Sequence, residues 1–366
     1  MSRKTPLFEK HRSLGGKIVD FAGWELPVQY SSAIEEHMAV REKAGLFDVS
    51  HMGEFELRGK ESPVFLSRLI PTSLSRLGIS SGMYSCLCNE KGGVIDDLFI
   101  FRKSSGMFYL VVNAATKDKD YNWISSRLDE GVIFEDVSDR TAKIDIQGPL
   151  SCEILKKLFP DSISREIESL DRFKFMETAY NGDALMISYT GYTGEQGYEL
   201  FISPETAPLL WDSLMAAGEP LGLLPCGLAA RDSLRLEACY SLYGHEISED
   251  INPVEAGLSW IVNSEESYTG SEVLKKVKAS GAPRKLYCLE VIDKGIPREG
   301  YPVEFNGEEI GYVTSGGYSP VKQKGIAMAL LKTGAVKTGD STDIIIRGKK
   351  VAAVVVKKPF YSFNKK

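Results

Sequence analysis

The chain has 366 residues, which is too long for one ordinary hydrophobic core and predicts two or three domains. Its formal net charge of −6 gives no reason to expect nucleic-acid binding, and its longest apolar stretches are too short to span a membrane. The first residues lack the hydrophobic segment of a signal peptide and include an acid, unlike a typical transit peptide, so the cytoplasm is the expected location.

The cysteines and histidines show no spacing typical of metal ligands. Cys86 and Cys88 have the wrong spacing for a zinc knuckle, no second pair accompanies them, and the four histidines are scattered. We therefore expect no metal site and reduced, mostly structural cysteines. The six cysteines are Cys86, Cys88, Cys152, Cys226, Cys239 and Cys288.

Residues 1–275 are predicted to form an α+β region of helices and antiparallel strands. Ser32 and Glu35 have the spacing of a capping box, which would open a helix running to about Gly45. The hydrophobic pattern and the turn residues predict the other elements. In chain order they are a hairpin over 83–101, a strand over 108–112, a helix over 116–128, a hairpin over 184–202, and helices over 204–217 and 226–238.

The pattern changes after about residue 280. Residues 279–283 combine Ser, Gly and Pro, which is typical of a linker. Beyond them, short alternating runs are separated by turn signals such as Asn306-Gly307 and Arg347-Gly348. We therefore expect residues 283–366 to form a small β-barrel or β-sandwich.

Two adjacent aspartates, Asp96 and Asp97, lie inside the apolar run over residues 94–101. Because strand side chains alternate, we expect Ile95 on the face of Asp97 and Val94 on the face of Asp96. An ionised carboxylate in apolar surroundings needs hydrogen-bond donors, a cation or a proton held at raised pKa. Folding alone would favour an apolar residue or Thr here, so the pair predicts a functional site.

Glu199 repeats this feature in a second apolar strand, although alternation leaves an exposed position equally open. Arg231 and Arg235 are four residues apart and share one face of a predicted helix. Paired arginines usually form surface salt bridges, and Asp232 and Glu237 are available as partners.

The loop over 191–197 is rich in glycine but lacks the spacing of a dinucleotide fingerprint and precedes a strand instead of a helix. We expect most of its glycines to serve a wide turn with positive φ. Carboxylates, arginines and tyrosines together would suit a flat heterocycle with polar edges and a negatively charged tail. The aromatic residues near these positions are Tyr84, Tyr189, Tyr192, Tyr198, Tyr240, Tyr243 and Trp260.

A series of motifs, in consistent order from residue 5 to about residue 361, closely resembles the T protein family of the glycine cleavage system, the tetrahydrofolate-dependent aminomethyltransferases. The motifs are Thr5–His11, Asp20–Trp24, Phe47–Glu54, Gly92–Asp97, Thr190–Glu195, Gly227–Glu237 and Val355–Tyr361. Each motif alone is weak evidence for the family, but the seven motifs together are specific for it. The resemblance implies a three-lobed fold around a central folate hole, with two intertwined α+β lobes over 1–275 and a C-terminal β-barrel over 283–366.

The resemblance also implies a reaction and two partners. The family takes an aminomethyl group carried on the lipoyl arm of H protein, releases ammonia and passes the one-carbon unit to tetrahydrofolate. The products are 5,10-methylenetetrahydrofolate and dihydrolipoyl H protein. No nucleic acid, membrane or metal is implied.

Residue roles are carried over by position. The resemblance implies that Asp97 is the catalytic carboxylate beside folate N10 and that Glu199 binds the amino-pyrimidine edge of the pterin. We interpret Asp96 as structural, hydrogen-bonded to the backbone or to a neighbouring arginine. Arg231 and, less directly, Tyr361 match substrate-site positions. Residues that match positions lining the ring or tail are Met52, Tyr84, Asn113, Tyr192 and Trp260. One departure is Phe101, which stands where some relatives have Tyr.

Two other functions compete with this one. A folate-linked demethylase domain, like the C-terminal halves of sarcosine or dimethylglycine dehydrogenases, would be fused to a flavin domain for which this chain has no room. A folate-binding accessory protein of the tRNA-modifying, iron–sulfur maintenance type would use a cysteine that resembles Cys239, but its preceding lysine is absent here and the spacing is longer. An acidic, exposed Cys239 would favour that alternative.

The C-terminal tail is rich in lysine. We hypothesise that these lysines help to dock an acidic carrier protein. They are Lys357, Lys358, Lys365 and Lys366.

Overall fold

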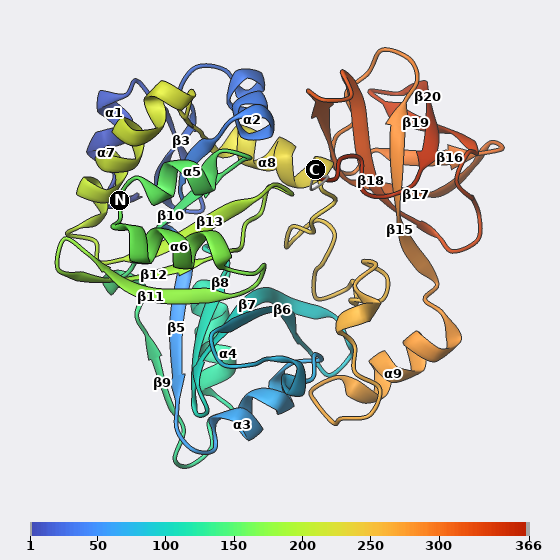
Figure 1. Ribbon diagram of the computed structural model, residues 1–366. Coiled ribbons are helices and arrows are strands. Elements are labelled where there is room, and N and C mark those ends of the chain that lie inside the picture. The colour runs from blue at the N-terminus through green and yellow to red at the C-terminus, as the bar shows by residue number, and fades with distance from the viewer. Residues whose placement is uncertain (1, 364–366) are drawn as a thin grey trace.

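The structure is a computed structural model that describes residues 2–363 (Figure 1). The α-helices are α1 Phe8–Ser13, α2 Ala33–Glu42, α3 Ser62–Leu69, α4 Lys117–Ser125, α5 Ser151–Lys156, α6 Asp161–Ser169, α7 Ala207–Gly218, α8 Leu228–Glu237 and α9 Ser271–Ser280. The first strands are β1 Arg3–Lys4, β2 Lys17–Phe21, β3 Trp24–Gln29, β4 Gly45–Asp48, β5 Gly53–Arg58, β6 Ser81–Cys88, β7 Val94–Ser104, β8 Met107–Val112, β9 Ile133–Asp136 and β10 Ala142–Gln147. The later strands are β11 Phe175–Tyr180, β12 Asp183–Ser188, β13 Gly197–Ile202, β14 Leu224–Pro225, β15 Arg284–Val291, β16 Pro302–Phe305, β17 Glu308–Ser319, β18 Lys324–Lys332, β19 Ser341–Ile346 and β20 Lys349–Val356.

The described residues form three open sheets and one closed barrel. A small sheet has the order β1-β3-β2, a six-stranded sheet has the order β11-β12-β13-β10-β4-β14, and a five-stranded sheet has the order β6-β7-β8-β5-β9. In Figure 1 the six-stranded sheet lies at the upper left, the five-stranded sheet below it, and the barrel β15-β18-β17-β16-β19-β20 at the upper right. The expected α+β fold with a C-terminal β-barrel is therefore confirmed.

Each large sheet has one face covered by helices, as a two-layer core requires. The six-stranded sheet packs Ile144 and Leu200 against Trp211 of α7 in one buried cluster. The five-stranded sheet packs Leu98 against Phe65 of α3 in another. The opposite faces of the two sheets therefore remain available to contact each other.

The two sheets meet through aromatic side chains on their inner faces. Phe101 of β7 packs edge-on against Phe175 and Phe201, with ring centroids 5.5 Å and 5.8 Å away. Side chains two residues apart on a strand share a face. Asp97 therefore lies on the inner face with Phe101, and Glu199 lies on the inner face with Phe201, so the fold turns both predicted site carboxylates toward the contact between the sheets.

The predicted hairpin around the aspartates is confirmed, but the expected alternation fails at its start. The pairing of β6 with β7 shifts register between Leu87 and Cys88, as at a β-bulge. As a result Ile95 packs with Leu98 in the core on the helix-covered side, and Val94 packs in a separate cluster with Cys88. The prediction that Ile95 shares the face of Asp97 is wrong for this reason.

Local chemistry explains where the two long helices near the site begin. The hydroxyl of Ser32 accepts a hydrogen bond from the backbone N–H of Glu35 at 3.2 Å, which confirms the predicted N-cap of α2. Before α8, Gly227 lies so close to the backbone of Val28 that an added Cβ would be 2.5 Å from the Val28 carbonyl carbon. Only glycine fits there, and this contact sets the position of α8 against β3.

The other predicted elements are present with shifted ends, and two interpretations were wrong. The predicted linker begins too early, because Ala279 and Ser280 belong to α9. In the glycine-rich loop only Gly194 has positive φ; Gly191 and Gly197 instead lie against the side-chain amide of Gln147, within 2.1–2.2 Å of where a Cβ would stand. Their role is close packing.

Candidate functional site

Asp97 lies near the start of β7, opposite Cys86 of β6, with its side chain partly buried. The Nδ2 atom of Asn113, just beyond β8, donates a hydrogen bond to Oδ1 of Asp97 at 2.8 Å. Burial, and then the neighbouring Asp96, raise the pKa of Asp97 to about 7. Within residues 2–363 no cation pairs with Asp97, so it can exchange a proton near neutral pH.

Asp96 points to the other face and is fully buried. Its Oδ1 accepts a hydrogen bond from Nδ2 of Asn113 at 2.9 Å, and its Oδ2 accepts from the Thr116 hydroxyl at 2.6 Å and the Asn113 backbone N–H at 3.3 Å. These contacts agree with the structural role expected for Asp96, with the backbone among its donors. No arginine contacts this carboxylate among the described hydrogen bonds.

Asp120 of α4 is a buried acid that the sequence did not single out. Burial, and then the charge of Asp96, raise the pKa of Asp120 to about 10, so it is protonated at neutral pH. Neither buried carboxylate oxygen of Asp120 has a hydrogen-bond partner among the described residues. Asn113 connects Asp96 to Asp97 by hydrogen bonds, and Asp120 is a protonated acid in the electrostatic field of Asp96. Residues 116–120 read as the exposed start of a helix. Nothing in the sequence therefore distinguishes Asp120 from an aspartate that is exposed to solvent.

Glu199 is buried, so the exposed alternative is excluded. Its Oε1 accepts a hydrogen bond from Nζ of Lys143 at 2.5 Å, and its Oε2 accepts from the hydroxyl of Thr190. Burial alone would raise the pKa of Glu199, but Lys143 reverses this and holds the pKa below its ordinary value. Each carboxylate oxygen can accept two hydrogen bonds, so both oxygens keep a free position.

Lys143 and Asp145 extend this cluster along β10, where Asp145 lies directly opposite Glu199. Lys143 donates to Asp145 at 3.0 Å, and Arg231 of α8 lies 3.4 Å from the second oxygen of Asp145. Burial raises the pKa of Asp145 to about 6. The sequence offered the same signal here as at Asp96, charged residues alternating with isoleucine in a buried strand, and it was missed.

Arg231 and Arg235 do not form the surface salt bridges that the spacing suggested. The Arg235 side chain is 3% exposed and pairs with the buried Glu246 at 3.1 Å as well as with Asp232. Glu237, the other predicted partner, instead accepts hydrogen bonds from Arg41 and Ser319. Arg231 keeps its guanidinium carbon 4.8 Å from the centre of the Tyr192 ring.

Aromatic rings connect the two carboxylate clusters. Tyr84 lies beside Trp260, with ring centroids 6.1 Å apart, and Trp260 is 56% exposed. The Tyr192 hydroxyl donates to the Ser241 carbonyl at 2.5 Å. Burial raises the pKa of Tyr192, and the negative charge of Asp97 raises it further. The Tyr192 hydroxyl is therefore close enough to Asp97 for the two groups to interact electrostatically.

Of the remaining predicted residues, Met52 joins this region and Tyr361 lies in another cluster. Met52 follows β4, where the chain crosses to the other large sheet, and packs against the aromatic contact between the sheets. The Tyr361 ring lies 3.9 Å from the guanidinium carbon of Arg41, and its N–H donates to the Glu237 carbonyl at 2.9 Å. The described contacts of Tyr361 do not reach Asp97.

Arg41 is the centre of that second cluster, which joins α2, α8 and the barrel. Its guanidinium donates to the carboxylates of Glu237 and Glu195, each at 3.0 Å, with every side chain almost fully buried. Glu237 also accepts a hydrogen bond from the Ser319 hydroxyl of β17. This buried network connects the barrel to the rest of the chain, although Oε2 of Glu195 has no hydrogen-bond partner among the described residues.

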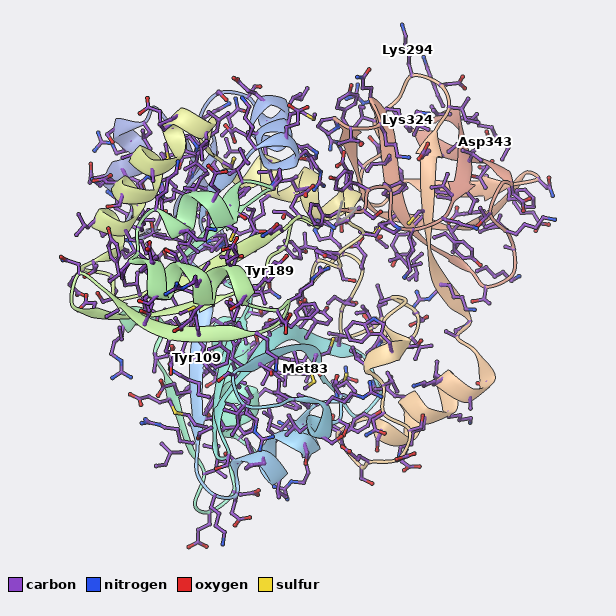
Figure 2. The ribbon with its side chains drawn as sticks, viewed as in Figure 1. Met83, Tyr109, Tyr189, Lys294, Lys324 and Asp343 are labelled. Carbon is purple, nitrogen blue, oxygen red and sulfur yellow. The ribbon has the colours of Figure 1, made fainter. Side chains whose placement is uncertain are left out.

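One cavity of the described structure contains none of the predicted site residues. It has a volume of about 470 Å³ and includes Lys103, Tyr109 and Glu177 in its lining. Tyr109 is labelled in Figure 2, and it packs in the aromatic contact between the sheets. Lys103 and Glu177 pair with each other at 2.6 Å, and the lining also includes Arg140 and Asp183. Phe101, which stands where some relatives have Tyr, packs in the same aromatic contact. Its side chain is fully buried, so no tyrosine hydroxyl is needed at this position.

Comparisons with known proteins agree with this geometry. Residues 7–266 match the family described as GCVT N-terminal domain, and residues 284–362 match the glycine cleavage T-protein C-terminal barrel domain. The chain is 46% identical to an aminomethyltransferase of Geobacillus sp. (strain WCH70) over 99% of both chains, and 44% identical to one of Anoxybacillus flavithermus over the whole of both. A crystal structure of the glycine cleavage system aminomethyltransferase T from Bartonella henselae superposes with a TM-score of 0.91 at 31% identity, covering 99% of this chain and 98% of that one.

A fold of two facing sheets with an appended six-stranded barrel, and buried carboxylates between the sheets, is that of the aminomethyltransferase class. The chain belongs to the glycine cleavage T-protein family. Between residues 2 and 363, no helix is long and apolar enough to cross a membrane.

Proposed function

We propose that this chain is the aminomethyltransferase of a glycine cleavage system. It takes the one-carbon unit of the aminomethyl group on lipoylated H protein, releases ammonia, and forms 5,10-methylenetetrahydrofolate and dihydrolipoyl H protein. Family membership over the full chain supports this proposal. The observation that carries it is Asp97, a carboxylate on the inner face of its sheet with a pKa of about 7 and no cationic partner among the described residues.

The residues present fit tetrahydrofolate. Glu199 has a free acceptor position on each oxygen, which suits the N–H donors of an amino-pyrimidine edge. The rings of Tyr84, Tyr192 and Trp260 suit the faces of a pterin and an aminobenzoyl group. When bound, tetrahydrofolate supplies the nitrogens that accept the one-carbon unit.

Asp97 is proposed as the group that holds and moves a proton beside folate N10. A pKa near the working pH lets one carboxyl group accept a proton in one step and return it in another. Asn113 orients it, and Asp96 stays bound to Thr116 and Asn113 as structural support. The surrounding apolar residues limit water, which strengthens the effect of the Asp97 charge.

The remaining pocket assignments are part of the same proposal. Arg231 is proposed to contact the substrate while Asp145 fixes its guanidinium at 3.4 Å, and Met52 is proposed to line the ring. Tyr361 is retained as a substrate-site residue on the resemblance, although its ring contacts Arg41.

We also propose H protein as the macromolecular partner and the cytoplasm as the location. Lys357 and Lys358 are exposed and available to an acidic carrier, whereas Lys365 and Lys366 lie outside the described residues. Reconstitution tests the function: purified chain, H protein bearing the aminomethyl-lipoyl arm, and tetrahydrofolate should give ammonia and 5,10-methylenetetrahydrofolate in equal amounts. Demethylation of an N-methyl amino acid with no reaction on aminomethylated H protein would favour the folate-linked demethylase instead.

A further inference from the structure

Cys239 and Cys288 face each other across the contact between α8 and the barrel. Their sulfur atoms lie 3.5 Å apart, although the residues are 49 positions apart in the chain. Cys239 stands in the turn that follows α8 and has a left-handed backbone with φ of 56°. Cys288 is in the middle of β15, paired with Met328 of β18 and Val356 of β20. The two thiols thus come from separate parts of the fold.

The surroundings give the two sulfurs different access. Cys288 is 3% exposed and packs with Leu236, Met328 and Phe360 in an apolar cluster. Cys239 packs at the edge of the same cluster and is partly exposed. A small solute therefore reaches Cys239 before Cys288.

The two thiols also differ in acidity. The Cys288 thiol hydrogen-bonds the Cys239 sulfur, and this contact, with the Phe360 backbone N–H and the charge of Lys358, lowers the pKa of Cys239 despite its burial. The same contact, and then burial, raise the pKa of Cys288 well above its ordinary value. Cys239 is therefore the more accessible cysteine and ionises more readily, whereas Cys288 beside it stays protonated. This is the arrangement of an attacking and a resolving cysteine.

We propose that Cys239 and Cys288 form a reversible disulfide when the protein meets a peroxide. The Cys239 thiolate attacks one peroxide oxygen, the O–O bond breaks, and the leaving oxygen takes a proton and departs as water or an alcohol. The Cys288 sulfur loses its proton and attacks the resulting sulfenic acid; the S–S bond forms, the S–O bond breaks, and a water leaves. Two thiols are oxidised and one peroxide is reduced.

The disulfide would fix the turn after α8 to the barrel beside the proposed site. The next residues along the turn are Tyr240, whose ring centroid lies 5.8 Å from that of Tyr192, and Ser241, whose carbonyl accepts the Tyr192 hydroxyl. Closing the sulfurs from 3.5 Å to a bond of about 2.05 Å requires a small shift of this turn. The proposal does not depend on the aminomethyltransferase reaction.

The test uses the full chain and hydrogen peroxide, followed by alkylation of free thiols and peptide mapping by mass spectrometry. We expect a single cross-linked peptide pair that contains Cys239 and Cys288, and its loss on treatment with dithiothreitol. In a Cys288→Ser variant, a sulfenic-acid trap should label Cys239 at least roughly tenfold faster than Cys152, the other partly exposed cysteine.

A Cys152→Ser variant is the matched control and should still form the cross-link. The proposal is overturned if oxidised wild-type protein keeps Cys288 fully open to alkylation after unfolding, or if Cys239 is oxidised to sulfinic acid without a cross-link. A cross-link between Cys239 and any other cysteine would also overturn it. Because the decisive readout is on wild-type protein, a variant that fails to fold does not affect the test.

Discussion

The side-chain nitrogen of Asn113 lies 2.8 Å from Oδ1 of Asp97. The same nitrogen lies 2.9 Å from Oδ1 of Asp96, so the two hydrogens of one amide serve two adjacent carboxylates. This arrangement fixes Asp97 in place while leaving it without a neutralising charge. It accounts for a carboxylate that can change protonation state near pH 7.

Replacing Asp97 with Asn keeps the shape of the side chain and removes its charge and its ability to exchange a proton. We expect turnover to fall by roughly 10²–10⁴-fold, with tetrahydrofolate affinity changed by less than about threefold. Steady-state kinetics and equilibrium binding measure the two effects. Asp118→Asn, at a side chain that is 92% exposed, is the control and should behave as wild type. Unchanged turnover in Asp97→Asn would remove this residue from the chemistry.

The pH dependence of the reaction follows from the raised pKa of Asp97. If the ionised form is active, kcat/KM should rise about tenfold per pH unit up to about pH 7 and then level off. Asn113→Ala removes a hydrogen bond that stabilises the carboxylate, so the midpoint should move to higher pH. The exposed Asn122→Ala is the control. A midpoint that stays in place, or moves to lower pH, would contradict this role of Asn113.

Glu199→Gln should weaken tetrahydrofolate binding more than it slows turnover. Losing a charged acceptor costs about 1.5–3 kcal/mol, or roughly 10–100-fold in Kd. Lys143 keeps Asp145 as a partner at 3.0 Å, so we expect the variant to fold. Calorimetric titration with tetrahydrofolate measures the change, and Glu177→Gln on β11, whose side chain is 56% exposed, is the control. A defect confined to turnover would contradict binding of the pterin edge by Glu199.

Asp120→Asn tests the protonated acid behind the site. The folded-state pKa of about 10 exceeds the unfolded value of about 4, so between these pH values the unfolded chain releases a proton that the folded chain keeps. The free energy of unfolding therefore falls as pH rises through this window in wild type. Because Asn does not titrate, the stability of the variant relative to wild type should increase between pH 5 and pH 8, by up to roughly 1.4 kcal/mol per pH unit. Urea unfolding at both pH values measures this, and a relative stability that is the same at both would show that Asp120 is ionised.

The lysines of the C-terminal tail test docking of an acidic carrier. The double variant Lys357→Gln and Lys358→Gln should bind lipoylated H protein roughly three- to tenfold more weakly at low ionic strength, with little difference from wild type at 0.5 M salt. Lys276→Gln on the exposed side of α9 is the control. Affinity for H protein that does not depend on salt would exclude this docking mode.

Much of the fold and part of the site could be predicted from local patterns. The hairpin around Asp96 and Asp97 followed from alternation, a glycine turn and an apolar run, and the barrel from closely spaced turn signals. The face of Ile95 could not be predicted, because a register shift depends on how β6 pairs with β7. A bulge of this kind leaves no local mark in the sequence.

The sequence also could not show which charges neutralise one another. Glu199 was recognised as unusual, but Lys143 and Asp145, 54 or more positions away in the chain, supply its surroundings through β10. Likewise the Arg41 side chain meets Glu237 and Tyr361 only because α2, α8 and the tail converge. Such partners are fixed by tertiary contacts, and the resemblance to a family located Tyr361 without describing its environment.

A crystal structure of the chain with tetrahydrofolate bound is the most direct test of the proposed site. We expect a carboxylate oxygen of Asp97 within hydrogen-bonding distance of N10 and the Glu199 carboxylate on the amino-pyrimidine edge. Tetrahydrofolate bound with N10 out of reach of Asp97, or bound in the cavity lined by Lys103 and Tyr109, would contradict the assignment of Asp97 as the catalytic carboxylate.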